Sequence, residues 1–329
     1  MASLRPFLMY LFLWSLCGLV FLCALRFGTA QISTAALFHG EAGVLSGRGF
    51  RAVCALAVGA ALAVSGLMLQ SLTGNPLADP GITGINAGAA LVAVAIAQFV
   101  PQASAVLLML SAIAGAGLAG LVLWFLAGGA ASLGSEGIAL RLPLAGLAIQ
   151  ALCLSLAMML ILTDAQSQAR YLHWISGAIP PVPRGETAAL LTICGALVVG
   201  VFLCNRLSLL TLGADQSRSL GRNPRLTVSL TLALVTVLSG ASVAIVGPVP
   251  FLGLLVPFVA RGLAGSELRR AYGYCVPLGA AALMASDLAG RVIVRPGEID
   301  AGLIVALFGG VGLIVVLTRL LPRSAQARP

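Results

Sequence analysis

Long apolar segments alternate with short polar ones along nearly the whole chain. A helix that crosses the hydrocarbon core of a bilayer, ~30 Å thick, needs about 20 mainly apolar residues. The pattern predicts ten such helices, at residues 6–25, 52–72, 82–100, 104–126, 143–163, 187–204, 226–246, 251–263, 272–294 and 301–321. We therefore expect one all-α transmembrane domain over residues 1–329.

The first apolar segment has a rival interpretation as a secretory signal peptide. The apolar core of a signal peptide is usually about 7–15 residues long, and the segment from Pro6 to Leu25 is longer. We expect it to be a retained transmembrane helix.

Two clusters of glycine and proline interrupt the apolar pattern. One covers Gly74–Gly81, after the second expected helix, and the other runs from Gly247 to Pro257, after the seventh. Proline and glycine at this density end helices and force turns. The clusters occupy matching places in two halves of five helices, which puts them on opposite membrane faces. Inverted halves with broken helices are typical of transporters.

The composition excludes several classes of protein. Hydrophobic residues make up 60% of the chain and charged residues only 9%, too few to cover the surface of a water-soluble domain of 329 residues. All 19 basic residues are arginines, so the lysine of a nucleotide-binding P-loop is missing. The seven cysteines and two histidines are scattered and predict no metal site.

The arginines also indicate an orientation. With the N-terminus in the cytoplasm, the cytoplasmic segments hold twelve arginines and the outer segments seven. Cytoplasmic loops carry the excess of positive charge, so both termini are expected in the cytoplasm. The twelve are Arg5, Arg141, Arg206, Arg218, Arg222, Arg225, Arg261, Arg269, Arg270, Arg319, Arg323 and Arg328, and the seven are Arg26, Arg48, Arg51, Arg170, Arg184, Arg291 and Arg295.

One cytoplasmic segment, Asn205–Arg225, is too polar to cross a bilayer, because it holds four arginines. Its leucines, among them Leu207 and Leu212, make it too apolar for a free linker. We expect short helices at the membrane surface that are available to a partner. An ordinary basic loop is the alternative.

The ninth expected helix carries two charges, Asp287 and Arg291. They lie four residues apart on one helix face, so an intrahelical ion pair is the simplest interpretation. A charge within the membrane is by default a functional hypothesis, but a paired one near a helix end favours a structural role.

Several motifs, in order along nearly the whole chain, resemble those of the FecCD-type permeases. These permeases are the membrane subunits of bacterial ABC importers for iron-siderophores, haem and vitamin B12. The matching stretches are Gly66–Gln70 with Asn75–Pro80, Gly84 with Gly88–Ala89, Gly213 with Arg218–Gly221, Gly247–Pro257, Ser266 with Arg270, Asp287 with Arg291, and Glu298–Ile299. The chain departs from the family pattern at Phe258, Asp300 and Val311, where histidine, proline and proline are usual.

The resemblance implies roles for particular residues. A cytoplasmic coupling segment, about 206–225, would dock onto a separate ATPase through Leu212, Gly213, Asp215, Arg218, Ser219, Leu220 and Gly221. Outer arginines would pair with glutamates of a periplasmic binding protein, with lipid phosphate as the alternative partner; these are Arg48, Arg51 and Arg291. The pathway or its structural motifs would involve Gln70, Asn75, Pro76, Asp79, Pro80, Gly247, Pro248, Pro257 and Asp287. Helix capping around the prolines explains Asn75 and Asp79 equally well, and a cytoplasmic gate is expected in or next to Ala131–Leu140.

The resulting expectation is the permease subunit of a type II ABC importer in the bacterial inner membrane. It would pair with a second permease chain, identical or related, and assemble with two ATPases, a binding protein and lipid, but no nucleic acid. It would catalyse nothing and hold no cofactor, since ATP and magnesium would bind to the partners. An iron-siderophore is the favoured cargo, then haem or a corrinoid. The alternative is a secondary transporter driven by an ion gradient, for which Asp287 is the candidate carboxylate.

Overall fold

The computed structural model describes residues 4–28, 42–100, 102–128, 135–162, 168, 171–172, 174–183, 185–211, 213–265 and 267–320. Within them it contains helices and no strand. The helices are α1 (Leu4–Arg26), α3 (Ala42–Thr73), η1 (Pro80–Thr83), α4 (Ile85–Phe99), α5 (Ala105–Leu126), α6 (Ser135–Ile161), α8 (Thr187–Leu210), α9 (Ala214–Ser219), α10 (Pro224–Val246), α11 (Leu252–Ala264), α12 (Leu268–Ile293) and α13 (Ala301–Leu320).

Ten of these helices match the ten expected membrane crossings. Seven are long and apolar enough to span a bilayer, and three shorter apolar helices cover Ile85–Phe99, Leu252–Ala264 and Ala301–Val315. The protein is therefore a multi-pass all-α membrane protein, as the hydrophobic pattern predicts. The largest differences in boundaries are at the starts of α3 and α6, which begin at Ala42 and Ser135 instead of residues 52 and 143, and at the end of α8, which continues to Leu210 instead of residue 204.

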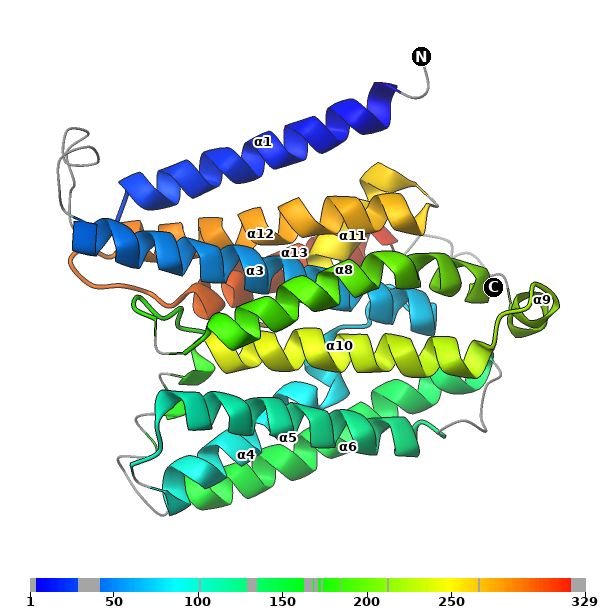
Figure 1. Ribbon diagram of the computed structural model, residues 1–329, viewed down its shortest axis with the longest axis horizontal. Helices are drawn as coiled ribbons and strands as arrows, with labels where there is room; N and C mark the ends of the chain where they lie inside the picture. Colours follow the sequence, from blue (N-terminus) through cyan, green and yellow to red (C-terminus); the bar gives the residue numbers. More distant parts are fainter. Residues whose placement is uncertain are drawn as a thin grey trace, which may run out of the picture.

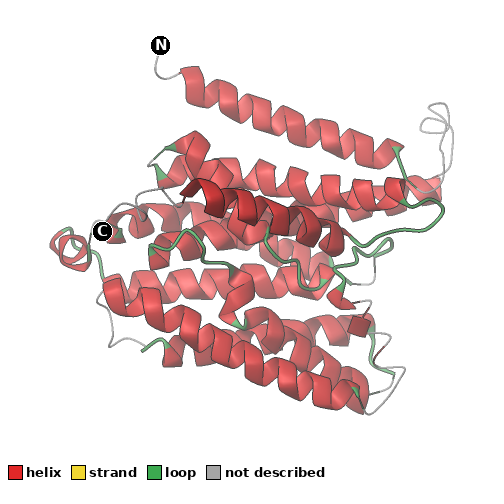
Figure 2. Ribbon diagram, turned by 180° about the vertical axis from the view of Figure 1, so that it is seen from behind, coloured by secondary structure: helices red, strands yellow, loops and turns green. Residues whose placement is uncertain are grey.

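The helices form one bundle whose members run roughly along its long axis (Figures 1 and 2). α1 lies along one side and α4, α5 and α6 along the other, with α3, α10 and α12 between them. The start of α1, the short helix α9 and the last turn of α13 lie at the same end, which we call the α9 end. An even number of crossings returns the chain to the side from which it started.

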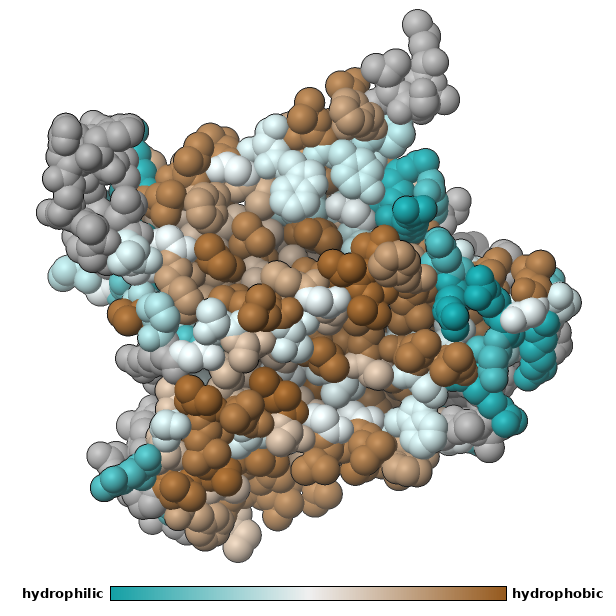
Figure 3. Space-filling view, in the orientation of Figure 1, coloured by the Kyte–Doolittle hydropathy of each residue, from teal (hydrophilic) through white to brown (hydrophobic). Residues whose placement is uncertain are grey.

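Hydropathy follows this architecture. Hydrophobic residues cover the flank of the bundle, and hydrophilic residues gather over the α9 end (Figure 3). Large apolar side chains remain exposed along the outer helices, for example Leu118, Leu191 and Phe202. A surface of this kind is stable in lipid, where no polar cover is needed.

The core is built around α3. Buried residues make up 89% of its most apolar stretch, and it packs against α12, α10, α11 and α8. Glycines permit the closest approaches, since a Cβ atom on Gly59 would lie 2.2 Å from the carbonyl oxygen of Gly279 in α12. One on Gly66 would lie 1.7 Å from the carbonyl oxygen of Gly253 in α11. Small residues that let backbones touch are the usual way to join helices in a membrane.

Candidate functional site

The two glycine- and proline-rich breaks meet inside the bundle. The first contains η1, whose preceding residue Asp79 is buried and accepts backbone hydrogen bonds from Gly81 and Phe251. The second turns sharply, with φ of 83° at Gly247 and 63° at Phe251. A positive φ is unusual for a residue with a side chain. The contact between Asp79 and Phe251 therefore joins a segment of the first half of the chain to its counterpart in the second half.

Neighbouring residues strengthen this junction of the two breaks. The side-chain amide of Gln70 donates to the carbonyl oxygen of Leu254 at 3.2 Å. A Cβ atom on Gly253 would lie 2.7 Å from Oδ1 of Asp79 and 2.8 Å from Pro80, so only glycine fits there. The helices before and after each break end inside the bundle. The dipoles of their terminal peptide groups and the carboxylate of Asp79 therefore lie within it, as in transporters with broken helices.

Other residues of the breaks have local structural roles. Oδ1 of Asn75 accepts from the backbone N–H of Leu77 at 2.9 Å, which forms a turn at the surface. Pro76 is exposed beside it. Pro257 lies within α11, where it is buried, and Gly247 and Pro248 lie in the connection between α10 and α11. Asn75 therefore stabilises the turn between α3 and η1 and does not cap either helix.

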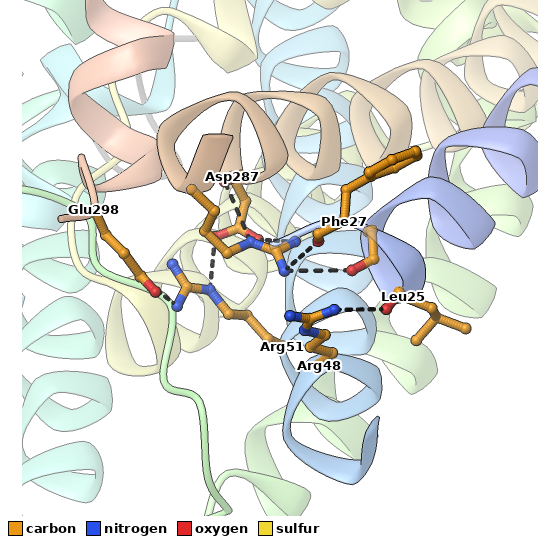
Figure 4. Close-up of polar contacts among 8 residues, drawn as sticks. Leu25, Phe27, Arg48, Arg51, Asp287 and Glu298 are labelled. Carbon is orange, nitrogen blue, oxygen red and sulfur yellow. Dashed lines mark hydrogen bonds and ion pairs between the residues drawn. The ribbon is translucent and has the colours of Figure 1, made fainter. Parts of the chain in front are cut away.

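A charged cluster, drawn in Figure 4, lies where α1 and α12 end and α3 begins, at the end of the bundle opposite the α9 end (Figure 1). Nε of Arg51 in α3 donates to Oδ1 of Asp287 in α12 at 2.7 Å, and its Nη1 donates to Glu298 at 2.8 Å. Nη2 of Arg291 lies 2.8 Å from Oδ2 of Asp287. The expected intrahelical pair between Asp287 and Arg291 is thus confirmed. A second cation, Arg51, 236 residues away in sequence, also binds Asp287, and Glu298 balances its charge.

Two arginines also cap the end of α1. Nη1 of Arg48 donates to the carbonyl oxygens of Leu25 and Arg26 at 3.2 and 3.0 Å. Nη1 of Arg291 donates to those of Ala24 and Phe27 at 3.3 and 3.4 Å. The last carbonyls of a helix have no partner within it and carry partial negative charge. Cations from α3 and α12 therefore hold the end of α1.

This arrangement differs from the expected exposed docking arginines. Arg48, Arg51 and Arg291 are only 7%, 7% and 3% exposed, and each is engaged within the chain. The sequence suggested a polar outer segment before a helix at residue 52, but α3 already includes Arg48 and Arg51. Buried cations require partners, and Asp287 and Glu298 supply them. Their contact with a binding protein stays a prediction.

The expected coupling segment is at the α9 end. Arg206 and its neighbours to Leu210 belong to α8, so only Ala214–Ser219 forms a separate short helix. Gly213 and Gly221 flank it with φ of 122° and 72°. Ser217 is buried, whereas Arg218, Ser219 and Leu220 are exposed. Leu212 lies outside the described residues, and so does the side chain of Asp215.

α9 is held between two long helices. The backbone N–H of Gly213 donates to the carbonyl of Leu210, at the end of α8, at 3.0 Å. On the other side, Oδ1 of Asn223 accepts from the N–H groups of Arg225 and Leu226 and caps α10. An exposed apolar Leu220 beside arginines gives this end a surface with both apolar and cationic contacts. The expected gate at 131–140 lies outside the described side chains.

Sequence reasoning identified Asp287 and its pair with Arg291 but missed the contacts of two other acids. Glu298 pairs with Arg51, and Asp300 accepts a hydrogen bond from the hydroxyl of Ser176. The available signal was that outer arginines outnumber what orientation requires. Because Glu298 and Asp300 lie in the same outer segments, this surplus of arginines indicates ion pairs within the chain as readily as it indicates binding to a partner protein.

Comparison with known proteins gives consistent results. Residues 16–319 match the FecCD transport family. The chain is 36% identical over 265 residues to a probable siderophore transport system permease protein, YfiZ, of Bacillus subtilis, covering 79% of this chain and 77% of the relative. It is 35% identical to the ferric enterobactin transport system permease protein FepD of Escherichia coli, with 84% and 82% covered. It is 34% identical to the hemin transport system permease protein HmuU of Yersinia pestis, with 79% and 78% covered.

A solved structure resembles the fold. It is an inward-facing conformation of a putative metal-chelate type ABC transporter, with a TM-score of 0.83. The two chains are 24% identical, and the match covers 96% of this chain and 100% of the other. At this identity the similarity establishes the arrangement of the helices.

Proposed function

Because the chain belongs to the FecCD transport family, we propose that it is the permease subunit of an ATP-driven importer of iron chelates in the bacterial inner membrane. The observation that carries the proposal is the match over residues 16–319 to a family of transport permeases. Relatives at 34–36% identity are named as siderophore, ferric enterobactin and hemin permeases. An iron-siderophore is the favoured cargo, and haem is the next.

The ATPase would be a separate subunit. The chain has no lysine and therefore no P-loop of its own. Two ATPases would dock at the α9 end, where Arg218 and Leu220 are exposed on or beside a short helix. The backbone N–H of Gly213, just before α9, bonds to Leu210 at the end of α8, and the N–H of Arg222, two residues before α10, bonds to the carbonyl of Ser217 in α9. A movement of α9 would therefore be transmitted to two long helices.

The pathway would lie between two permease copies, with a binding protein at the end opposite the α9 end. ATP-driven closure of the ATPases would shift the helices that meet at the junction of the breaks. The turns that connect α4 and α11 to their neighbours can absorb such a shift, because hinge motions are taken up by a few loop or element-terminal residues. The structure thus supports a rocking mechanism in which the chain itself makes no covalent bond.

The charged cluster argues against a proton-driven alternative. Such a transporter needs a carboxylate that takes up and releases protons within the membrane. Both oxygens of Asp287 are engaged with Arg51 and Arg291, so this carboxylate already serves as the partner of two buried cations.

Co-purification tests the proposal. The chain would be expressed with the ATPase and permease genes beside its own and isolated in mild detergent, and subunit masses would be measured. We expect two permease chains with two ATPases, and loss of the ATPases from Arg218→Glu. Arg295→Glu is the matched control, because this exposed arginine lies at the opposite end.

Transport provides the second readout. In proteoliposomes with the purified complex, uptake of a ferric siderophore should require ATP and persist when an uncoupler removes ion gradients. Uptake that proceeds without ATP and is abolished by the uncoupler would refute the proposal. If the purified complex contained two different permease chains, the proposed mechanism would still hold, and the pore would be formed by a heterodimer.

A further inference from the structure

A cavity of about 550 Å³ opens at the end of the bundle opposite the α9 end. It lies between α4, α5, the end of α10, and the connections before α8 and α13. Sites for small organic ligands usually have volumes of about 300–1,000 Å³. The cavity is therefore large enough to surround a small molecule, and none of the roles described above uses it.

The walls are mostly apolar. Val94 of α4, Met109 of α5 and Ile245 of α10 contribute, and so do the aromatic side chains of Tyr171 and Trp174. The two rings are tilted against each other with centroids 6.4 Å apart. An apolar body gains from leaving water for such walls, and aromatic faces also attract cations.

Carboxylates dominate the charged part of the wall that the structure describes. Glu186, Glu298 and Asp300 line the cavity, together with Arg51. Arg51 already binds Asp287 and Glu298, and Asp300 accepts from Ser176. A carboxylate has about four lone-pair sites and accepts further bonds while it holds one partner. The polar wall therefore offers acceptors, which suit a ligand that brings several donors.

We propose that this cavity is a binding site for a small organic cation, a molecule with an apolar body and an ammonium group at one end. The ammonium group supplies three donors and a positive charge to the wall that carries Glu186 and Asp300. The body lies against Trp174 and the aliphatic side chains of α4, α5 and α10. The proposal does not depend on the transport function, since binding needs neither ATPase nor cargo.

Tryptophan fluorescence of the purified full-length chain in nanodiscs tests the site. Trp14→Phe and Trp124→Phe leave Trp174, in the cavity wall, as the sole tryptophan of the three in the chain. The probe is 2-phenylethylammonium, compared with the neutral 2-phenylethanol and the anionic 3-phenylpropanoate. We expect a saturable change in emission with the cation and weaker binding of the alcohol by roughly tenfold, as for a charge-assisted hydrogen bond.

Two conservative variants locate the charged end of the ligand. Glu186→Gln and Asp300→Asn should each weaken binding of the cation several-fold and leave the weak binding of the alcohol unchanged. Glu186 makes no side-chain cap to α8, so its replacement does not uncap that helix. Glu267→Gln removes an exposed carboxylate at the α9 end and should change nothing.

A third variant tests occupancy of the cavity. Ala97 lines it and is partly exposed, so Ala97→Phe adds bulk to the wall with little disturbance of the core and should abolish the saturable signal. Equal affinity for the alcohol and the cation would refute charge recognition. No saturable signal with any probe, or full binding by Ala97→Phe, would refute the site itself.

Discussion

α1 and α3 are equally hydrophobic and are placed in opposite environments. Both have a mean hydropathy of 2.3 over their most apolar stretch, yet 17% of that stretch is buried in α1 and 89% in α3. α1 carries large side chains such as Phe12 and Leu19, which are 61% and 59% exposed. α3 carries glycines and alanines along the faces that touch other helices.

Side-chain size, more than hydropathy, therefore separates core helices from lipid-facing ones in this protein. Lipid tails are as apolar as leucine, so burial of leucine in protein gains little from the hydrophobic effect. Close contact gains dispersion energy instead, and it requires small residues where backbones meet. Gly59 and Gly66 provide this in α3, whereas a Cβ atom added to Gly18 in α1 would meet no described atom within 4 Å.

The two helices are nevertheless connected at one end. Arg48 of α3 binds the last carbonyls of α1, and Arg51, one turn further on, binds Asp287 of α12. Gly28 leaves room for this, because a Cβ atom there would lie 2.7 Å from Nη2 of Arg48. A peripheral helix with little buried area thus gains polar contacts at this end, in addition to the packing of Leu13 and Cys17 in the core.

The largest expected effect comes from a bulky residue at the tight contact. Gly66→Leu should prevent native packing, with a loss of more than about 4 kcal/mol, because the first added atom meets the Gly253 backbone. Gly18→Leu should change stability by less than about 0.5 kcal/mol. The measurement is thermal unfolding of the purified proteins, with the monodisperse fraction as a check. Equal tolerance of both variants would remove the distinction between α1 and α3.

A smaller loss is expected from the connection between the helices. Asp287→Asn leaves two buried guanidinium groups without their shared carboxylate and should cost about 3–5 kcal/mol. The exposed pair between Glu267 and Arg270 is the control, since Glu267→Gln should cost no more than about 1 kcal/mol. Chemical denaturation of both variants measures the difference. A mild effect of Asp287→Asn would mean that the cluster is hydrated and not structural.

The smallest effect is local to α1. Arg48→Met removes the cap and should speed hydrogen exchange of the last-turn amides of α1 by roughly tenfold, while the amides in the centre of α3 stay protected. Arg26→Met is the matched control, because that exposed guanidinium lies over the ring of Phe27, 5.5 Å from its centroid. Faster exchange throughout α3 would contradict a purely local attachment.

Local patterns were the ones that the sequence predicted well. The ten apolar helices, the two breaks and the pair of Asp287 with Arg291 each depend on residues close together in the chain. The hydrophobic pattern predicts too late a start for α3, because Arg48 and Arg51 indicate a polar segment. Charged residues are stable within an apolar helix when partners far away in the sequence neutralise them. The local sequence pattern does not show which residues those partners are.

Among the candidate sites, those formed by one segment of the chain were predicted, and those formed by distant segments were not. The α9 segment was found from its polarity, and α9 is indeed a short helix with exposed residues. The contact between Asp79 and Phe251 was not predicted, since it joins two breaks far apart in the chain. The cavity was also missed, because its lining residues come from several separate segments that no single motif includes.

The class of protein, its helices, its breaks and its family can be read from the amino-acid order alone, because each follows from local composition or from motifs. Which of two equally apolar helices forms the core, and which carboxylates neutralise Arg51, is established by the folded chain, because hydropathy adds up residue by residue along one segment. Packing and ion pairing depend on surfaces that meet only after the chain has folded.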